Sequence, residues 1–295
     1  MILIISSVPE ATLLELKGYD CVQHDNVIVC EDRVKDKLDS LQSIQYMCEV
    51  LLQDDLLGLK EFPVMEDGSI TIEFTNVPKE VRSEMHPHLA GLAKRKIDYK
   101  TPDIVLRVVR ADKDYLTRQL HQHDLSKRDY RIFAHKQGFR GDFAFMIVQK
   151  CDPERTGLQI YGVKDGALLF EQIRRYDEFP MQRVFEPEQS TIRSLDRHLR
   201  LEGVRDKVEV HGGDWKNVGE KLAPAQNNLV FLTRSDESKL NTIFTYFSRM
   251  SSGDKLHVLC RSQCHLHAHS AFTVEATEQV SRGQHTYNFY TFVKS

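Results

Sequence analysis

The hydrophobic positions in the first 110 residues predict short strands and helices in mixed order. Apolar or alternating stretches predict strands, and apolar residues three or four positions apart predict amphipathic helices. We expect strands at 2–7, 21–23, 27–30, 70–74 and 104–109, and helices at 9–17, 32–52 and 81–95. Such an order, without regular alternation of strand and helix, is typical of an α+β region.

The second half of the chain shows a regular alternation instead. Strands are expected at 158–161, 183–186, 207–211, 228–233 and 255–260, with helices at 166–177, 189–202 and 237–250. This alternation predicts a parallel, doubly wound α/β sheet in which each helix joins neighbouring strands. The aromatic, alternating segment 287–293 predicts a late antiparallel edge pair. We place the boundary between the two halves near residues 125–145.

Composition favours a globular, cytoplasmic protein. No apolar run approaches the ~18 residues that a membrane span needs, and the first residues carry no basic segment typical of a signal peptide. The six cysteines show no framework spacing, so we expect reduced thiols.

Charge is unevenly distributed although the net charge is only −3. Residues 94–140 contain thirteen Lys and Arg and six Asp, a local excess of seven positive charges. The rest of the chain therefore carries an excess of about ten negative charges. A segregated basic segment is typical of phosphate contacts, although a solvated charged surface gives the same pattern.

Two acidic residues follow predicted strands of the second half. Glu186 ends one strand, and Asp214 comes after the next strand and a Gly-Gly pair. At the carboxyl ends of parallel strands, one carboxylate can accept both ribose hydroxyls and the second can face the attached base. This arrangement indicates a nucleoside cofactor such as S-adenosylmethionine. Helix capping at strand ends would place acids there as well.

Two segments resemble a known family. Residues 101–104 lead into a strand, and 124–131 read Asp-Leu-Ser-Lys-Arg-Asp-Tyr-Arg, similar to the "Leu-Ser … Lys-Arg-Gly-Tyr-Arg" loop at the end of a THUMP domain, with Asp129 in place of Gly. The chain thus resembles THUMP-containing methyltransferases, which modify guanine N2 in tRNA or rRNA. The resemblance implies a ferredoxin-like domain at 1–50, a THUMP-like domain at 51–125 and a Rossmann-like class I methyltransferase domain at 126–295.

The family's first methyltransferase motif, Asp-Pro-x-x-Gly-x-Gly-Gly-x-x-x-Glu, aligns with residues 160–171. Glu171 matches its last residue, Ile160 replaces its Asp, and only Gly166 remains of its glycines. Lys164 and Asp165 would place side chains where the backbone must approach the cofactor. The resemblance implies that Gly166, Glu186 and Asp214 would bind S-adenosylmethionine. We nevertheless expect weak or no binding.

The family's catalytic motif, Asp/Asn-Pro-Pro-Tyr/Phe, is also altered. Residues 228–236 occupy its place, and both prolines and the aromatic residue are missing. Thr233 and Asp236 are the remaining candidates to position a target amine, and Arg234 would bring a positive charge beside a cationic donor. Because methyl transfer requires preorganised groups, we expect weak or lost catalysis.

Other side-chain clusters favour ordinary structural roles. The segment 260–269 contains Cys260, Cys264, His265, His267 and His269, which could bind zinc. Their close spacing favours a simple loop, and we predict no metal. Phe133, Phe139, Phe143 and Phe145 stand among basic residues and could stack on bases, but a core at the domain junction is favoured. Trp215 could pack near an adenine or cover the sheet edge.

The sequence therefore favours an RNA-binding pseudoenzyme whose partner is structured RNA, either tRNA or rRNA. The predicted RNA contacts are Lys94, Arg95, Lys96, Lys127, Arg128 and Arg131. One alternative is an active S-adenosylmethionine-dependent methyltransferase, and another is an assembly factor that docks a protein. Homodimerisation, or pairing with a catalytic or activating subunit, is expected through an exposed sheet edge.

The resemblance also makes a geometric prediction. Gly166, Glu186, Asp214 and Thr233 should converge on one rim of the sheet, despite their separation in sequence. In a pseudoenzyme, Lys164 or Arg234 should pair with Glu186 or Asp214 in the place of a cofactor.

Overall fold

In a computed structural model, the chain divides into two compact units, Met1–Lys127 and Arg128–Ser295. The structure describes residues 1–63, 65–121, 123–128, 130, 138–175, 181–261, 266, 269–282 and 285–295, with only the backbone at 234, 235, 237 and 282. The predicted division of the first unit into ferredoxin-like and THUMP-like domains remains a prediction. Its expected boundary after residue 50 falls inside a strand, β4.

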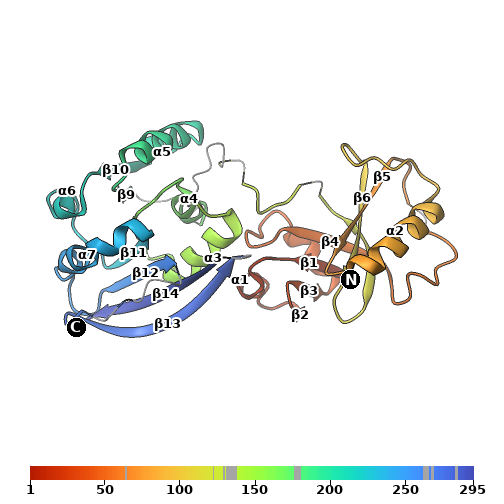
Figure 1. The fold of residues 1–295 in the computed structure, drawn as a ribbon, viewed down its shortest axis with the longest axis horizontal. Coiled ribbons are helices and arrows are strands. Elements are labelled where there is room, and N and C mark those ends of the chain that lie inside the picture. The colour runs from red at the N-terminus through yellow and green to blue at the C-terminus, as the bar shows by residue number, and fades with distance from the viewer. Residues whose placement is uncertain are drawn as a thin grey trace. The chain divides into compact units, whose positions relative to one another are not determined.

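The first unit is built on one seven-stranded sheet with the order β2-β3-β1-β4-β7-β6-β5. Its elements are β1 (Ile2–Ile5), α1 (Pro9–Glu15), β2 (Cys21–His24), β3 (Val27–Cys30), the 3-10 helix η1 (Asp32–Lys37), β4 (Tyr46–Gln53), β5 (Ile70–Thr75), α2 (Lys79–Ala93), β6 (Ile104–Arg110) and β7 (Asp114–Gln119). Strands β5 and β6 pair in parallel, and the other neighbouring strands of this sheet are antiparallel. Met85 and Leu89 of α2 pack on Ile70 and Leu106, which places α2 against β5 and β6 (Figure 1). This mixed architecture agrees with the predicted α+β region.

The helix predicted over residues 32–52 is wrong. Only η1 is helical there, and residues 46–53 form β4, which pairs with both β1 and β7. Met47 packs in one hydrophobic cluster and Cys48 in another, so successive residues of β4 are buried on opposite faces of the sheet. A strand with two buried faces reads as a nearly continuous apolar run, which a helical period also fits.

The second unit contains a seven-stranded sheet with the order β10-β9-β8-β11-β12-β14-β13. Its strands are β8 (Gln159–Tyr161), β9 (Gln182–Glu186), β10 (Val208–Gly212), β11 (Asn227–Leu232), β12 (Lys255–Arg261), β13 (Phe272–Arg282) and β14 (His285–Lys294). Its helices are α3 (Gly141–Cys151), α4 (Ala167–Arg174), α5 (Gln189–Leu201), α6 (Val218–Lys221) and α7 (Leu240–Phe247), with 3-10 turns η2 (Arg205–Lys207), η3 (Trp215–Asn217) and η4 (Arg234–Lys239). The strands from β8 to β12 are parallel and β14 is antiparallel to both of its neighbours. Helices lie along this sheet as the alternation predicts (Figure 1).

Neither β7 nor α3 is among the predicted elements. The described residues of α3 are almost all buried, including Phe143, Ile147 and Val148. A helix that is buried all round lacks the amphipathic stripe on which a prediction from periodicity depends. Its aromatic residue Phe143 and the preceding Phe139 pack against Tyr287 inside the second unit, which makes them core residues and not a base-stacking surface. Phe133 lies outside the described residues.

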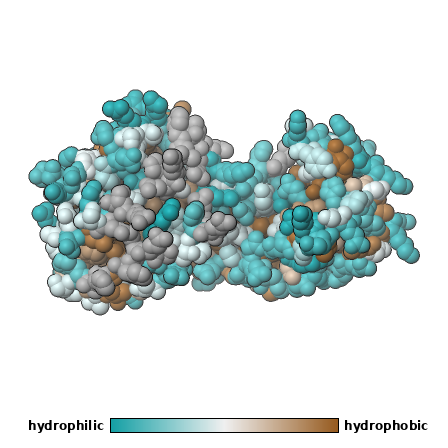
Figure 2. Space-filling model, viewed as in Figure 1, coloured by the Kyte–Doolittle hydropathy of each residue, from teal (hydrophilic) through white to brown (hydrophobic). Residues whose placement is uncertain are grey.

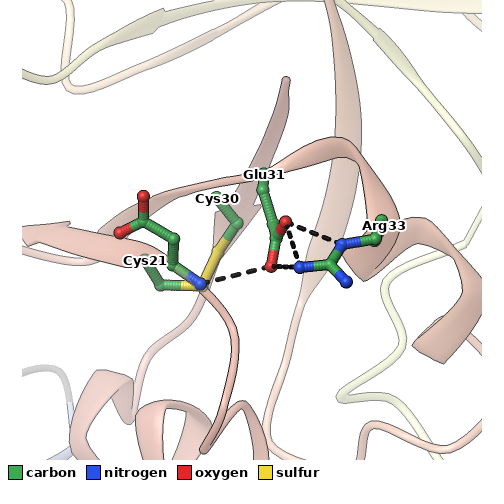
Figure 3. Close-up of a disulfide and its surroundings, with 5 residues drawn as sticks. Cys21, Cys30, Glu31 and Arg33 are labelled. Carbon is green, nitrogen blue, oxygen red and sulfur yellow. Dashed lines mark hydrogen bonds and ion pairs between the residues drawn. A yellow bond between two sulfur atoms is a disulfide. The ribbon is translucent and has the colours of Figure 1, made fainter.

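Two cysteines are paired, so the expectation of six reduced thiols is wrong for them. Cys21 and Cys30 stand directly opposite each other in β2 and β3 and form a disulfide (Figure 3). Their Cα atoms are 4.3 Å apart, which antiparallel pairing imposes and the sequence spacing does not reveal. Cys48, Cys151 and Cys260 are buried thiols outside this disulfide. In the described parts of the chain, no helix combines the length and apolar character that a bilayer crossing requires.

Candidate functional site

Four neighbouring parallel strands bring the predicted cofactor residues to one rim of the second sheet. Strands β10, β9, β8 and β11 are adjacent and parallel. Gly166, Glu186, Asp214 and Thr233 lie at or just after their carboxyl ends. The chain order reverses between β8 and β11, which is where doubly wound sheets bind ligands. The predicted convergence is confirmed.

The loop after β8 keeps a glycine-type backbone although one of its residues is a lysine. Gly162 has φ +74°, and a Cβ there would lie 2.4 Å from the carbonyl oxygen of Phe231. Gly166 has φ +86°, and a Cβ would meet Leu195 and Phe170 at 2.8 Å. Between them, Lys164 adopts φ +55°. A non-glycine residue in this left-handed region carries a cost of about 1 kcal/mol, so the surrounding contacts must hold it there.

Those contacts centre on Glu186, whose carboxylate is fully buried. The backbone N–H of Lys164 donates to its Oε2 at 2.9 Å, and the Lys164 ammonium lies 3.3 Å from its Oε1. The backbone N–H of Glu188 donates to Oε1 at 3.0 Å. Lys164 itself is only 6 % exposed. The predicted pairing of Lys164 with Glu186 is therefore confirmed. The ammonium of a residue in the loop after β8 binds the carboxylate that was expected to face a ribose.

The two catalytic candidates bond to each other. The Thr233 hydroxyl and backbone N–H both donate to Asp236 Oδ2, at 2.7 and 3.0 Å. The Trp215 indole N–H donates to Asp236 Oδ1 at 3.4 Å. The Asp236 carboxylate thus accepts the Thr233 backbone N–H, as the fourth residue of a capping box does with the first, at the start of η4. The Thr-x-x-Asp spacing is a signal from which the structural role could have been predicted.

Trp215 and Asp214 also make structural contacts. Trp215 is buried and packs on Phe185 and Tyr161, with ring centroids 5.0 and 6.3 Å away. Asp214 is exposed, and its carboxylate accepts the backbone N–H of Lys216 at 3.0 Å to cap η3. The side chain of Arg234, the other predicted cation at this rim, lies outside the described residues.

The loop 124–131 and the segment 160–171, which aligns with the family's first methyltransferase motif, meet at Glu171. Its buried carboxylate accepts Arg128 Nε at 2.8 Å and the Tyr130 hydroxyl at 2.7 Å. Burial opposes the charge on Arg128, but Glu171 holds the pKa of the guanidinium above its usual value. Burial, together with Glu171, raises the pKa of Tyr130 well above its usual range. The prediction that Arg128 contacts RNA needs correction, because the guanidinium is 8 % exposed and paired.

The remaining predicted RNA contacts differ in accessibility. Lys94 is exposed at the C-terminus of α2, Lys96 is 80 % exposed, and Lys127 is exposed. Arg95 is 20 % exposed and donates to the carbonyl oxygen of Met65 at 2.9 Å. Arg131 lies outside the described residues. Other cations of the basic segment are bound to acids of the first unit: Arg107 to Glu73, Arg110 to Asp114, Lys113 to Asp54 and Arg118 to Glu49. The positive surface is therefore smaller than the sequence count indicates.

A metal centre is absent from the residues that the structure describes. Cys264, His265 and His267 lie outside those residues. Of the rest of that cluster, Cys260 is buried in β12, and the His269 ring stacks on Phe244 at 5.9 Å.

Comparison with known proteins shows the fold. No family model matches the chain, and no curated protein matches its sequence. TrmN from Thermus thermophilus superposes over 100% of this chain and 99% of its own, with a TM-score of 0.80 and 15% identity. The fold is that of a Rossmann-like methyltransferase preceded by an α+β region. This confirms the predicted fold class.

Two further solved structures cover the whole chain. SMU.472, a putative methyltransferase complexed with SAH, gives a TM-score of 0.71 at 10% identity and is covered over 98% of its length. A predicted N6-adenine-specific DNA methylase from Listeria monocytogenes gives 0.62 at 11% identity, with 96% covered. At such identities the likeness concerns the fold.

The residues at the rim do not fit S-adenosylmethionine. A ribose would need the Glu186 carboxylate as acceptor, and three N–H donors of the protein already engage it. The Lys164 ammonium would also have to leave a buried ion pair, which is costly because its charge would lose its compensation. Groups of the protein itself therefore fill the position at the rim that the resemblance assigns to the cofactor.

Proposed function

We propose that this chain is an RNA-binding protein of the THUMP methyltransferase kind that does not use S-adenosylmethionine. The observation that carries the proposal is the buried Lys164–Glu186 pair. In the family that the sequence resembles, a carboxylate at this place holds the cofactor. Here the ammonium of Lys164, a residue of the protein itself, pairs with that carboxylate.

Loss of catalysis follows from the second half of the rim. A methyl acceptor must be held by groups with free hydrogen-bonding capacity in near-attack geometry. The Thr233 hydroxyl hydrogen-bonds to the Asp236 carboxylate, which also accepts the indole N–H of Trp215. Freeing either group would require opening the cap of η4.

RNA is supported as the partner by charge and by the fold. Lys94, Lys96 and Lys127 are exposed cations in a segment with a strong positive excess, while the rest of the chain is acidic. Such segregation favours a polyanion at one surface. One protein of the same fold is described as a predicted DNA methylase, which accords with a nucleic-acid partner. The sequence resemblance favours tRNA or rRNA, gripped through phosphates and 2′-hydroxyls.

Calorimetric titration with S-adenosylmethionine tests the proposal. We expect no measurable binding to the wild-type protein or to Lys164→Arg, which keeps the cation. Lys164→Gly removes the cation and suits the left-handed backbone, so it should bind more tightly than wild type. A micromolar Kd for wild type, lost in Glu186→Ala, would overturn the proposal in favour of the active methyltransferase.

A further inference from the structure

Tyr99 stands out on the surface of the first unit. Its side chain is 70 % exposed, more than any other large hydrophobic side chain that the structure describes. It lies in the loop between α2 and β6, just beyond the predicted phosphate contacts Lys94 and Lys96. An isolated exposed aromatic residue needs no explanation, so the way this ring is held and the groups around it decide whether it has a role.

Backbone contacts hold the loop that presents Tyr99. The N–H of Asp98 donates to the carbonyl oxygen of Ile70, and the N–H of Ile70 donates to that of Lys96, both at 2.9 Å. The Asp98 carboxylate then accepts the N–H groups of Lys100 and Thr101, at 2.9 and 3.0 Å. The first two bonds tie the residues before Tyr99 to β5, and the last two close a turn around Tyr99. The ring is therefore presented by an ordered turn, which reduces the entropy lost on binding.

The Tyr99 ring also rests on a second aromatic ring. It stacks on His86 of α2 with centroids 6.4 Å apart and an interplanar angle of 20°, and its hydroxyl lies 3.4 Å from His86 Nε2. His86 in turn contacts Phe74 of β5 at 6.2 Å. A short aromatic column thus runs from the strand through the helix to the surface, and Tyr99 is its outer member.

Lysines stand on both sides of Tyr99 in the sequence. Lys94, Lys96 and Lys100 are all exposed. The acid closest in sequence, Asp98, is 23 % exposed; its Oδ1 accepts backbone N–H groups, and its Oδ2 lies 3.9 Å from the Lys96 ammonium, which is itself 80 % exposed. Much of the visible surface of this unit is hydrophilic (Figure 2). An exposed aromatic face among lysines is the combination with which proteins hold unpaired nucleotides.

We propose that Tyr99 is a stacking platform for an unpaired nucleotide, with Lys94, Lys96 and Lys100 contacting the flanking phosphates. The inference rests on the proposed RNA-binding function and adds the form of the RNA. Bases within a duplex are already stacked on their neighbours, so they cannot use the ring. The site therefore selects single-stranded ends, loops or bulges.

The test compares a single-stranded oligoadenylate of about twelve nucleotides with an RNA duplex of similar length, by fluorescence anisotropy at one salt concentration. Tyr99→Ala should weaken single-strand binding by about tenfold, from the ~1–3 kcal/mol that base stacking contributes, and leave duplex binding unchanged. Tyr99→Phe should retain single-strand binding. Leu14→Ala, which removes another side chain of the first unit that is 62 % exposed, is the matched control and should behave as wild type.

A fluorescent variant provides a direct readout. The fluorescence that Tyr99→Trp adds should be quenched by the single strand and not by the duplex. The fluorescence of buried Trp215 should change with neither RNA. Equal single-strand affinity of Tyr99→Ala and wild type would overturn the platform. If the triple Lys94/Lys96/Lys100→Ala variant then still bound RNA more weakly than wild type, the proposed RNA-binding function would stand. If wild type bound neither probe, both proposals would fall.

Discussion

Glu171 and Glu186 are fully buried, and each is neutralised by a cation of the same unit. Removing one member of a buried ion pair costs about 3–5 kcal/mol, because the other charge is left without compensation. Both carboxylates are therefore committed to stabilising the second unit. At the scale of single residues, the two acids on which the resemblance rests act here as structural charges.

His257 gives the second unit a predictable response to acid. It lies in β12, is 3 % exposed and stacks on Phe289. Burial, with Lys255 nearby, lowers the pKa of His257 to about 4, whereas an unfolded histidine titrates near ~6.5. The unfolded state therefore binds more protons between these values. The stabilisation is complete above about pH 6.5 and decreases as the pH falls towards 4, by up to ~1.4 kcal/mol per pH unit.

Urea unfolding at pH 7 and pH 5 checks this expectation. The free energy of unfolding of wild type should fall more between the two values than that of His257→Gln, which cannot take up the proton. The difference between the two proteins cancels the contribution of other titrating groups. Parallel pH dependences would show that His257 is not responsible.

At the scale of elements, the hairpin of β2 and β3 depends on a covalent link. β2 is the edge strand of its sheet and has only four residues, and the disulfide joins it to β3. Next to it, Glu31 accepts both Arg33 and the backbone N–H of Asp20 (Figure 3). A closed loop of about this length stabilises a protein by ~3 kcal/mol.

Thiol titration and thermal unfolding test the role of this link. After denaturation without reductant, the protein should show two fewer reactive thiols than after reduction. The Cys21→Ser/Cys30→Ser variant should unfold at a lower temperature, and added reductant should lower the Tm of wild type but not that of the variant. Equal numbers of reactive thiols with and without reductant would contradict the disulfide.

At the scale of the whole molecule, charge segregation predicts salt-dependent RNA binding. Each lysine that neutralises a phosphate displaces counterions, so the slope of log K against log salt reports how many phosphates the protein neutralises. Replacing Lys94, Lys96 and Lys127 by Ala should reduce that slope by about 0.7–0.9 for each phosphate that is no longer neutralised. Filter binding of a tRNA-sized RNA over a range of salt concentrations measures it.

A charge-matched variant provides the control for this measurement. Lys17, Lys37 and Lys216 are exposed lysines outside the basic segment, and their replacement changes the net charge equally. For this variant, the slope of log K against log salt should stay close to that of wild type. An equal reduction in both variants would mean that only net charge matters, and the assignment of the basic segment would fail.

The sequence by itself determined the alternation of parallel strands and helices from β8 to β12 and the position of their rim. Strand and helix alternate there with clear periods, and parallel strands must bring their carboxyl ends to one edge, so Glu186, Asp214 and Thr233 could be placed together. The sequence also predicted that Lys164 or Arg234 would pair with Glu186 or Asp214, and the structure shows the Lys164–Glu186 pair. These inferences depend on local pattern and on the few topologies that such a pattern allows.

Only the tertiary structure decided how the charges and the doubly buried segments are used. Arg128 reads as a free cation in sequence, but its partner Glu171 is 43 positions away. β4 has apolar residues that fit a helix, and pairing with β1 and β7 makes it a central strand. Cys21 and Cys30 meet because two strands align them. In each case the deciding contact is non-local, and local sequence preferences carry no information about which distant group supplies it.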